Sequence, residues 1–156
     1  LGSGGAARAI AFALATGTGI AGLTILGIEE VERQKLVKDL RDKTNIPIED
    51  GPLTLDMLRN WVPHVRTLIH CTPVGMSPRV EESCVPTNLF RPELTVMDIV
   101  YNPRETKLLQ EAKAAGCRTI SGLEMFLNQA VLQFELWTKQ PAPADVMRRV
   151  LESRFG

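Results

Sequence analysis

The sequence lacks an excess of charge of either sign. Its 18 Lys and Arg residues are balanced by 18 Asp and Glu residues, so the formal net charge at pH 7 is zero. A general nucleic-acid binder carries a basic patch or stripe, and a protein that binds anionic membranes carries a polybasic segment. We therefore expect neither nucleic acid nor a membrane among the partners of this protein.

Long uninterrupted apolar runs are also missing. The most apolar stretch, residues 6–28, is divided by Arg8 and by the TGTG run at 16–19. Because a membrane-spanning helix needs about 20 consecutive apolar residues, this stretch is predicted to form a helix and a strand of a buried α/β core.

Cysteine is scarce, and its pattern excludes the usual cysteine chemistries. Cys71, Cys84 and Cys117 are odd in number and far apart, and they form no C-x-x-C pair. Neither a disulfide framework nor a metal site is predicted from such spacing. Reduced thiols in a cytoplasmic protein are the expected state.

Strand-like and helix-like segments alternate along the chain, which is typical of βαβ units. Strands are predicted over residues 22–26, 46–48, 65–70, 94–101 and 117–120. Helices are predicted over residues 6–15, 29–43, 54–62, 103–115, 122–138 and 144–152. A proline-rich loop without periodicity, residues 72–88, is long enough to suggest a function. The pattern predicts an α/β fold with a doubly wound parallel sheet.

Two of these helices carry start signals. Asn102 is predicted to cap the helix that follows the strand 94–101, with Pro103 at its first position. Ser121 and Glu124 have the spacing of a capping box at the start of the next helix.

A glycine cluster opens the chain. Gly2, Gly4 and Ala7 have the G-x-G-x-x-[GA] spacing of a dinucleotide-binding turn, in which the first glycine permits a sharp strand-to-helix turn. The second glycine lets main-chain N–H groups approach a pyrophosphate, and the small third residue lets the helix pack on the sheet. The start of this helix favours a phosphate. The residues predicted to hold the pyrophosphate are Gly2, Ser3, Gly4, Gly5, Ala6 and Ala7.

Such a turn follows a strand, and only Leu1 stands before it here. In doubly wound sheets that strand lies near the middle of the strand order, so the fold needs it. We therefore expect the first strand to lie in residues that precede this sequence.

Three further motifs follow the glycine turn: HCTPVGM at 70–76, DIVYNPRET at 98–106 and GLEMFLNQA at 122–130. Together with GSGGAARA at 2–9, and in this order, they resemble the C-terminal cofactor domain of shikimate dehydrogenases, over nearly the whole chain. That family reduces 3-dehydroshikimate with NADPH on the route to aromatic amino acids. The resemblance implies a cytoplasmic NAD(P)-dependent oxidoreductase of the shikimate pathway, acting on shikimate as a monomer or homodimer.

The resemblance also implies a domain organisation. Residues 1–138 would form a Rossmann-type NAD(P)-binding domain without its first strand, and residues 139–156 a linker and helix that pack toward a separate N-terminal substrate domain. In the family, that substrate domain carries the Lys–Asp pair that assists proton transfer at the reacting hydroxyl. No comparable pair is found here, so no catalytic residue is assigned, and the isolated chain is expected to be inactive.

Site residues are assigned through the same resemblance. The ribose and nicotinamide parts of the cofactor are expected to lie against Thr72, Pro73, Val74, Ile99, Gly122 and Met125. The hydroxy-acid substrate is expected to form hydrogen bonds with Tyr101 and Gln129. Met125 and Gln129 are four residues apart, so one face of the predicted helix carries both.

One departure from the family concerns the choice of cofactor. After the strand 22–26 the family has an Asn-Arg-Thr-like stretch, whose Arg pairs with the 2′-phosphate of NADP, whereas this chain has Gly27, Ile28, Glu29 and Glu30. An acid suits the ribose hydroxyls of NAD, so Glu29 is a candidate cofactor ligand. Glu29 and Glu30 are equally well explained as favourable charges at a helix N-terminus. Because Arg33 could swing back toward the ribose, NAD and NADP both stay open.

A second departure is His70, which replaces the Asn of the family's loop motif. A catalytic histidine needs a neighbouring base and a residue that orients it, and the sequence offers neither. We interpret His70 as a histidine at the end of a strand.

Other functions share part of this pattern. An NAD-preferring quinate or quinate/shikimate dehydrogenase would carry every motif, and a non-catalytic nucleotide-binding module would carry the glycine turn. Tyr101, Met125 and Gln129 argue for an enzyme, because a binding module needs no substrate contacts. Glutamyl-tRNA reductase also shares the turn, but YNPxxT followed by GxxMxxxQA is not expected there.

Overall fold

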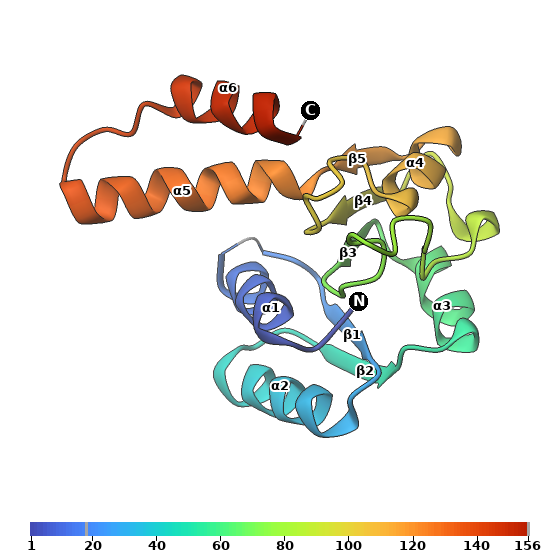
Figure 1. Cartoon of the computed structure of the whole chain (residues 1–156). Coiled ribbons are helices and arrows are strands. Elements are labelled where there is room, and N and C mark those ends of the chain that lie inside the picture. Colours follow the sequence, from blue (N-terminus) through green and yellow to red (C-terminus); the bar gives the residue numbers. More distant parts are fainter. Residues whose placement is uncertain (18, 156) are drawn as a thin grey trace. The chain divides into compact units, whose positions relative to one another are not determined.

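The computed structural model describes residues 1–17 and 19–155, which divide into two compact units, Leu1–Thr72 and Pro73–Gly156. Helices and strands alternate through both units (Figure 1). The paired strands are parallel, β1 with β2 in the first unit and β4 with β5 in the second. The predicted α/β class with parallel strands is confirmed.

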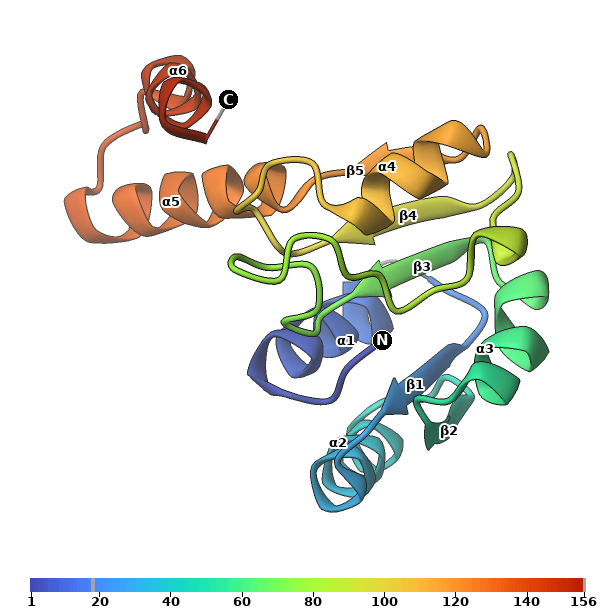
Figure 2. The same cartoon turned by 45° about the vertical axis from the view of Figure 1, so that its right-hand side comes forward.

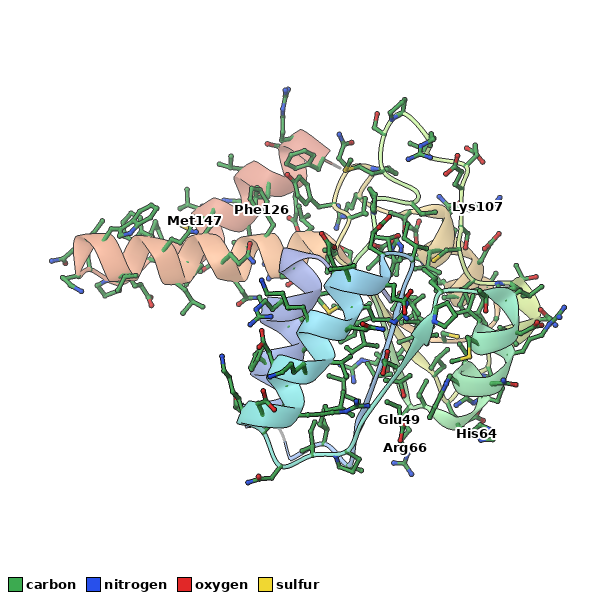
Figure 3. The ribbon with its side chains drawn as sticks, turned by 90° about the horizontal axis from the view of Figure 1, so that it is seen from below. Glu49, His64, Arg66, Lys107, Phe126 and Met147 are labelled. Atoms are coloured by element: carbon green, nitrogen blue, oxygen red, sulfur yellow. The ribbon has the colours of Figure 1, made fainter. Side chains whose placement is uncertain are left out.

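The first unit is built around a parallel strand pair with helices packed against it. Its elements are α1 (Gly5–Gly17), β1 (Leu23–Gly27), α2 (Glu30–Lys43), β2 (Ile48–Pro52), α3 (Leu55–Trp61), the short helix η1 (Val62–His64) and β3 (Thr67–His70). β1 and β2 pair from Leu23 with Ile48 to Gly27 with Pro52. A buried cluster, which includes Ile25, Leu36 and Leu40, joins β1 and β2 to α1 and α2. His64, labelled in Figure 3, is exposed at the end of η1.

The apolar stretch 6–28 is divided as its sequence predicts. Helix α1 ends at Gly17, and β1 begins at Leu23. Ala7 and Ala11 are the buried residues of α1. Among the helices in the described part of the chain, none combines the length and the apolar character that crossing a membrane requires.

The first residue of the chain is bonded as part of a parallel ladder. The amino group of Leu1 donates a hydrogen bond of 2.6 Å to the carbonyl of Ile69, and the N–H of Cys71 donates one of 2.8 Å to the carbonyl of Leu1. This is the pattern of a residue paired with His70 on a parallel strand. On the other side, the N–H of Gly2 donates to the carbonyl of Leu26 at 2.7 Å. The chain at Leu1–Gly2 therefore links β1 and β3 as a strand end would.

The second unit contains a parallel strand pair and a pair of long helices. Its elements are η2 (Thr87–Leu89), β4 (Thr95–Asp98), α4 (Lys107–Ala114), β5 (Arg118–Ile120), α5 (Gly122–Thr138) and α6 (Ala144–Phe155). Helix α5 ends at Thr138, and its C-cap Lys139 has a left-handed backbone (φ 58°). Helix α6 then returns along α5 (Figures 1 and 2).

Several predicted boundaries differ from the structure, among them those of β2, β4 and α4. The weak strand predicted at 46–48 is β2, displaced to Ile48–Pro52. The strand predicted at 94–101 ends at Asp98, and the next helix begins at Lys107 with Thr106 as its cap, so the prediction that Asn102 caps it is wrong. The reason is tertiary: the buried carboxylate of Asp98 accepts a 2.6 Å hydrogen bond from the Thr106 hydroxyl, which leaves residues 99–105 as a loop.

Candidate functional site

The glycine turn has the geometry that its spacing predicts. Gly2 has φ +103°, and a Cβ atom there would lie 2.8 Å from the carbonyl oxygen of Cys71, so only glycine fits. Gly4 is exposed, and a Cβ atom on it would meet nothing within 4 Å. Ala7 is buried beneath the first turn of α1. Gly2 thus allows the turn, Gly4 leaves its main chain accessible, and the small Ala7 is buried in the packing of α1.

A cavity of about 340 Å³ adjoins this turn. It is lined by Ser3, Gly4, Gly5, Arg8, Glu32, Lys35 and Leu36. Cavities of this size hold small ligands. The first main-chain N–H groups of a helix have no partner within the helix and attract anions, so the cavity at the start of α1 suits a diphosphate.

Arg8 lines the cavity but is held toward α2. Its Nη2 lies 2.6 Å from Oδ2 of Asp39, and its guanidinium lies 5.1 Å from the ring centre of Phe12. The hydrogen bond from Arg8 lowers the pKa of the Asp39 carboxyl below its ordinary value. This ion pair joins α1 to α2 beside the cavity.

The end of β1 lies next to the glycine turn. A Cβ atom on Gly27 would lie 2.7 Å from Oγ of Ser3, so an asparagine at position 27, as in the family motif, would displace Ser3. After Gly27, Ile28 is 76% exposed and Glu29 is exposed at the N-cap of α2. Glu29 thus stands just after the carboxyl end of β1, where dinucleotide-binding domains place an acid for the ribose hydroxyls.

Arg33 is directed inward, toward Gly27 and Asp50. Its Nη1 donates a 2.9 Å hydrogen bond to the carbonyl of Gly27, and its Nε donates a 3.1 Å hydrogen bond to Oδ2 of Asp50. The side chain is only 9% exposed. In this structure Arg33 is part of the packing between β1, β2 and α2.

Thr72 and His70 lie at the end of β3. His70 is the last residue of β3 and is buried, and its Nε2 contacts the hydroxyl of Thr72. The Thr72 methyl group would lie 3.3 Å from a Cβ atom on Gly2. The structure therefore brings Thr72 to the glycine turn, and the position of His70 agrees with its interpretation as a strand-end residue.

In the second unit, Ile99 and Gly122 are in close contact. A Cβ atom on Gly122 would lie 2.3 Å from the carbonyl oxygen of Ile99 and 2.6 Å from that of Val100. The start of α5 can pack on this main chain only because residue 122 has no side chain. Two residues assigned to the nicotinamide by resemblance are thus neighbours.

Buried Asp98 fixes the loop that carries Ile99. One carboxylate oxygen accepts a 3.0 Å hydrogen bond from the N–H of Val100, and the other accepts the bond from Thr106. The Thr106 oxygen also accepts from the N–H of Leu109, which caps α4. Asp98 and Thr106 were missed as functional candidates, although both belong to the DIVYNPRET motif.

Tyr101 lies in the same loop, packed between two aromatic side chains. Its ring stacks on Phe126 of α5, with centroids 4.8 Å apart and planes 6° apart, and meets the edge of Phe155 of α6 at 5.5 Å. Tyr101 is still 37% exposed. Figure 3 labels Phe126 together with Met147 of α6, where the two helices run side by side. The Tyr101 ring is therefore positioned by α5 and α6.

The remaining predicted residues are less enclosed. Met125 is half-buried and Gln129 exposed, both on α5, while Pro73 is exposed and Val74 half-buried in the loop that opens the second unit. The stripe of α5 with Met125 and Gln129 continues into two exposed leucines, Leu132 and Leu136.

An ion pair that the sequence did not indicate joins α5 to α6. Arg148 donates two hydrogen bonds to the carboxylate of Glu124, of 2.5 and 2.9 Å. This bond lowers the pKa of Glu124 below its ordinary value of 4.5. Ser121 caps α5 as predicted, by accepting from the N–H of Leu123, but the Glu124 carboxylate pairs with Arg148.

Comparison with known proteins supports the resemblance. The family described as "Shikimate 5'-dehydrogenase C-terminal domain" matches residues 122–152. A shikimate dehydrogenase (NADP(+)) of Moorella thermoacetica is 42% identical over 100% of this chain and 52% of its own length. The chain spans about half the length of the relatives it matches.

Solved structures show the same fold. Shikimate 5-dehydrogenase of Listeria monocytogenes, in complex with shikimate and NAD, matches 96% of this chain and 53% of its own with 33% identity and a TM-score of 0.89. Quinate dehydrogenase of Corynebacterium glutamicum, in complex with NAD, matches 97% of this chain and 53% of its own with 27% identity and a TM-score of 0.88. The resemblance to the C-terminal domain of shikimate dehydrogenases, and with it the Rossmann-type fold, is confirmed.

Proposed function

We propose that this chain is the nucleotide-binding half of an NAD(P)-dependent oxidoreductase that interconverts shikimate and 3-dehydroshikimate. The observation that carries the proposal is the glycine turn: Gly2 at φ +103°, Gly4 with open space above it and Ala7 buried at the start of α1. With the adjoining cavity, this arrangement fits a dinucleotide. When bound, the nicotinamide cofactor supplies the hydride chemistry.

The residues of the first unit bind the phosphate and adenosine end. The N–H groups at Ser3–Ala7 hold the diphosphate at the N-terminus of α1, where the helix dipole favours negative charge. Thr72 borders the turn, and Glu29 accepts hydrogen bonds from the ribose hydroxyls.

The residues of the second unit bind the reactive end. Ile99, the main chain of Gly122 and Met125 lie against the nicotinamide, and Pro73 and Val74 border its ribose. Tyr101, fixed by its aromatic neighbours, and Gln129 form hydrogen bonds with the hydroxy-acid substrate. A positioned ring and a helical amide orient the substrate hydroxyl, and orientation is a large part of hydride-transfer catalysis.

Proton transfer at that hydroxyl is assigned to a substrate domain in the part of the enzyme that corresponds to the other half of the relatives' length. Residues 139–155 and the exposed apolar side chains nearby pack toward that domain. They are Leu132, Leu136, Trp137, Val146 and Val150. Apolar side chains gathered on two adjacent helices favour a protein contact.

The cofactor proposed is NAD in preference to NADP. Glu29 and Glu30 repel a 2′-phosphate, Ile28 offers it no hydrogen bond, and Arg33 is bonded to Gly27 and Asp50. A quinate/shikimate dehydrogenase is the second candidate, because a quinate dehydrogenase with NAD shares the fold at a TM-score of 0.88. We propose that the full-length enzyme acts in the cytoplasm as a monomer or homodimer.

The test is an assay of the full-length protein with shikimate or quinate and with NAD or NADP, followed by absorbance of the reduced nucleotide. We expect shikimate and NAD to give the highest kcat/KM. Faster oxidation of quinate would favour the second candidate. Binding of nucleotide without reduction in any combination would contradict the enzyme proposal and favour a non-catalytic module.

A matched variant tests the cofactor assignment. Ile28→Arg places a guanidinium where the family has one, without the displacement of Ser3 that an asparagine at position 27 would cause. We expect NADP affinity to rise while NAD affinity changes little. An unchanged preference would show that the 2′-position of the ribose lies elsewhere.

A further inference from the structure

The guanidinium of Arg33 lies at the end of β1, close to the proposed site of the adenosine ribose, but it is bonded to protein groups. Arg33 lies in the first turns of α2, and Nη1 donates 2.9 Å to the carbonyl of Gly27, the last residue of β1. In dinucleotide-binding domains the residues just after this strand meet the adenosine ribose, and an Arg nearby accommodates a 2′-phosphate. Arg33 therefore has the chemistry for NADP, but its donors are turned to the protein interior.

Asp50 is the carboxylate that holds it there. Asp50 lies on β2, opposite Ile25 of β1, and Oδ2 accepts the 3.1 Å hydrogen bond from Nε of Arg33. A charge-assisted bond to a side chain that is 9% exposed persists better than a solvent-exposed pair. Asp50 thus fixes the direction of the Arg33 side chain.

The other charged groups near Arg33 do not replace Asp50. Arg41 lies 3.6 Å from Oδ1 of Asp50, but its guanidinium also donates to the carbonyl of Ile48 at 2.7 and 3.2 Å and is 53% exposed. The first turn of α2 carries Glu30 and Glu32 after the N-cap Glu29, and all three residues are exposed. We expect these carboxylates to attract the Arg33 guanidinium toward solvent once its bond to Asp50 is lost.

We propose that Asp50 is a specificity-determining residue that acts through Arg33: by holding the guanidinium inward, it denies a 2′-phosphate its natural partner and leaves the ribose edge to carboxylates. The inference rests on the proposed dinucleotide site. Asp50 touches neither substrate nor cofactor and is a positioning residue.

The experiment measures the Kd of NAD and of NADP for the full-length protein by isothermal titration. The variants are Asp50→Asn, Arg33→Met and the double variant. In Asp50→Asn the Kd for NADP is expected to fall by roughly tenfold, since a bond to a charged group is worth that much, while the Kd for NAD stays within about twofold. Arg33→Met alone leaves the NAD/NADP ratio unchanged, and the double variant returns it to the original value.

Asp42→Asn is the matched control. It removes a carboxylate that pairs with Lys38 on the exposed side of α2, so the ratio of the two Kd values should not move. If Asp50→Asn folds poorly, Asp50→Thr replaces it, because threonine has no carboxylate and suits a strand. The same fall in the Kd of NADP is expected in that variant.

Equal changes in the Kd values of NAD and NADP in both Asp50 variants would overturn the inference. So would a fall in the Kd of NADP that persists in the double variant, which lacks Arg33. Those outcomes differ from failure of the proposed function, in which the unmodified protein binds neither nucleotide.

Discussion

The two units contribute different chemical groups to the proposed site. In Leu1–Thr72 the groups proposed to bind the diphosphate are main-chain N–H groups, accessible because Gly2 turns the chain and Gly4 has no side chain. In Pro73–Gly156 the groups proposed to bind the substrate are side chains on a loop and on α5, and that loop is held by the buried Asp98–Thr106 pair and by the stack of Tyr101 on Phe126. A main-chain site depends on local backbone geometry, whereas a side-chain site depends on contacts between distant elements.

The largest expected effect on stability concerns Gly122, which packs against the main chain of Ile99 in the second unit. Gly122→Ala places a Cβ atom 2.3 Å from the Ile99 carbonyl oxygen, and main chain cannot move aside as a side chain can. We expect the free energy of unfolding to fall by about 3 kcal/mol, measured by urea denaturation. Gly5→Ala is the control: its Cβ meets nothing within 4 Å, and stability should stay the same or rise by up to about 1 kcal/mol. Equal midpoints for Gly122→Ala and the unmodified protein would contradict the packing described.

The second prediction separates the two roles of glycine in the first unit. Gly2→Ala meets both a positive φ and the Cys71 carbonyl at 2.8 Å, so we expect a loss of about 2 kcal/mol in stability. Gly4→Ala, in open space, should leave stability within about 0.5 kcal/mol but weaken NAD binding about tenfold, because the new methyl group lies where the diphosphate approaches. Urea denaturation and nucleotide titration give both values. Unchanged NAD affinity in Gly4→Ala would separate the turn from the cofactor.

The third prediction tests the buried hydrogen bond between Thr106 and Asp98, which flank the loop that carries Tyr101. Thr106→Val keeps the shape but removes the hydroxyl that donates 2.6 Å to Asp98. Because a buried acceptor loses its partner, stability should fall by about 2 kcal/mol. In the full-length enzyme the KM for shikimate should rise while the Kd of NAD changes little. Thr106→Ser retains the hydroxyl and should restore both; if it behaves like Thr106→Val, the bond is not the cause.

The smallest effect belongs to the ion pair between α5 and α6. The pKa of Glu124 is lowered by Arg148, so the pair contributes stability above pH 4.5 that is lost as the pH falls through the lowered value. Both side chains are partly exposed, 42% and 44%, so solvent screening keeps the contribution of the pair small. The stability difference between the unmodified protein and Arg148→Met should be present at pH 7 and vanish in acid. A difference independent of pH would assign the effect of Arg148 to packing alone.

Local signals were enough for most of the fold. The order of helices and strands, the turn at Gly2 and the Ser121 cap were predicted because each depends on a few neighbouring residues. The end of β4 and the start of α4 were misplaced, because Asp98 and Thr106 meet only after the loop between them folds. The same holds for Glu124, whose predicted capping partner was replaced by Arg148, 24 residues away.

For the site, the sequence by itself determined the sharp turn at Gly2 into the first helix, since the Gly-x-Gly-x-x-Ala spacing encodes a local backbone shape. It also determined which side chains share a face of α5, because helical periodicity follows from spacing. Only the tertiary structure decided that Arg33 points to Asp50, that Gly122 rests on the Ile99 main chain and that Tyr101 is held between Phe126 and Phe155. Each of these depends on the direction of a side chain among partners distant in sequence, and that direction is fixed by packing.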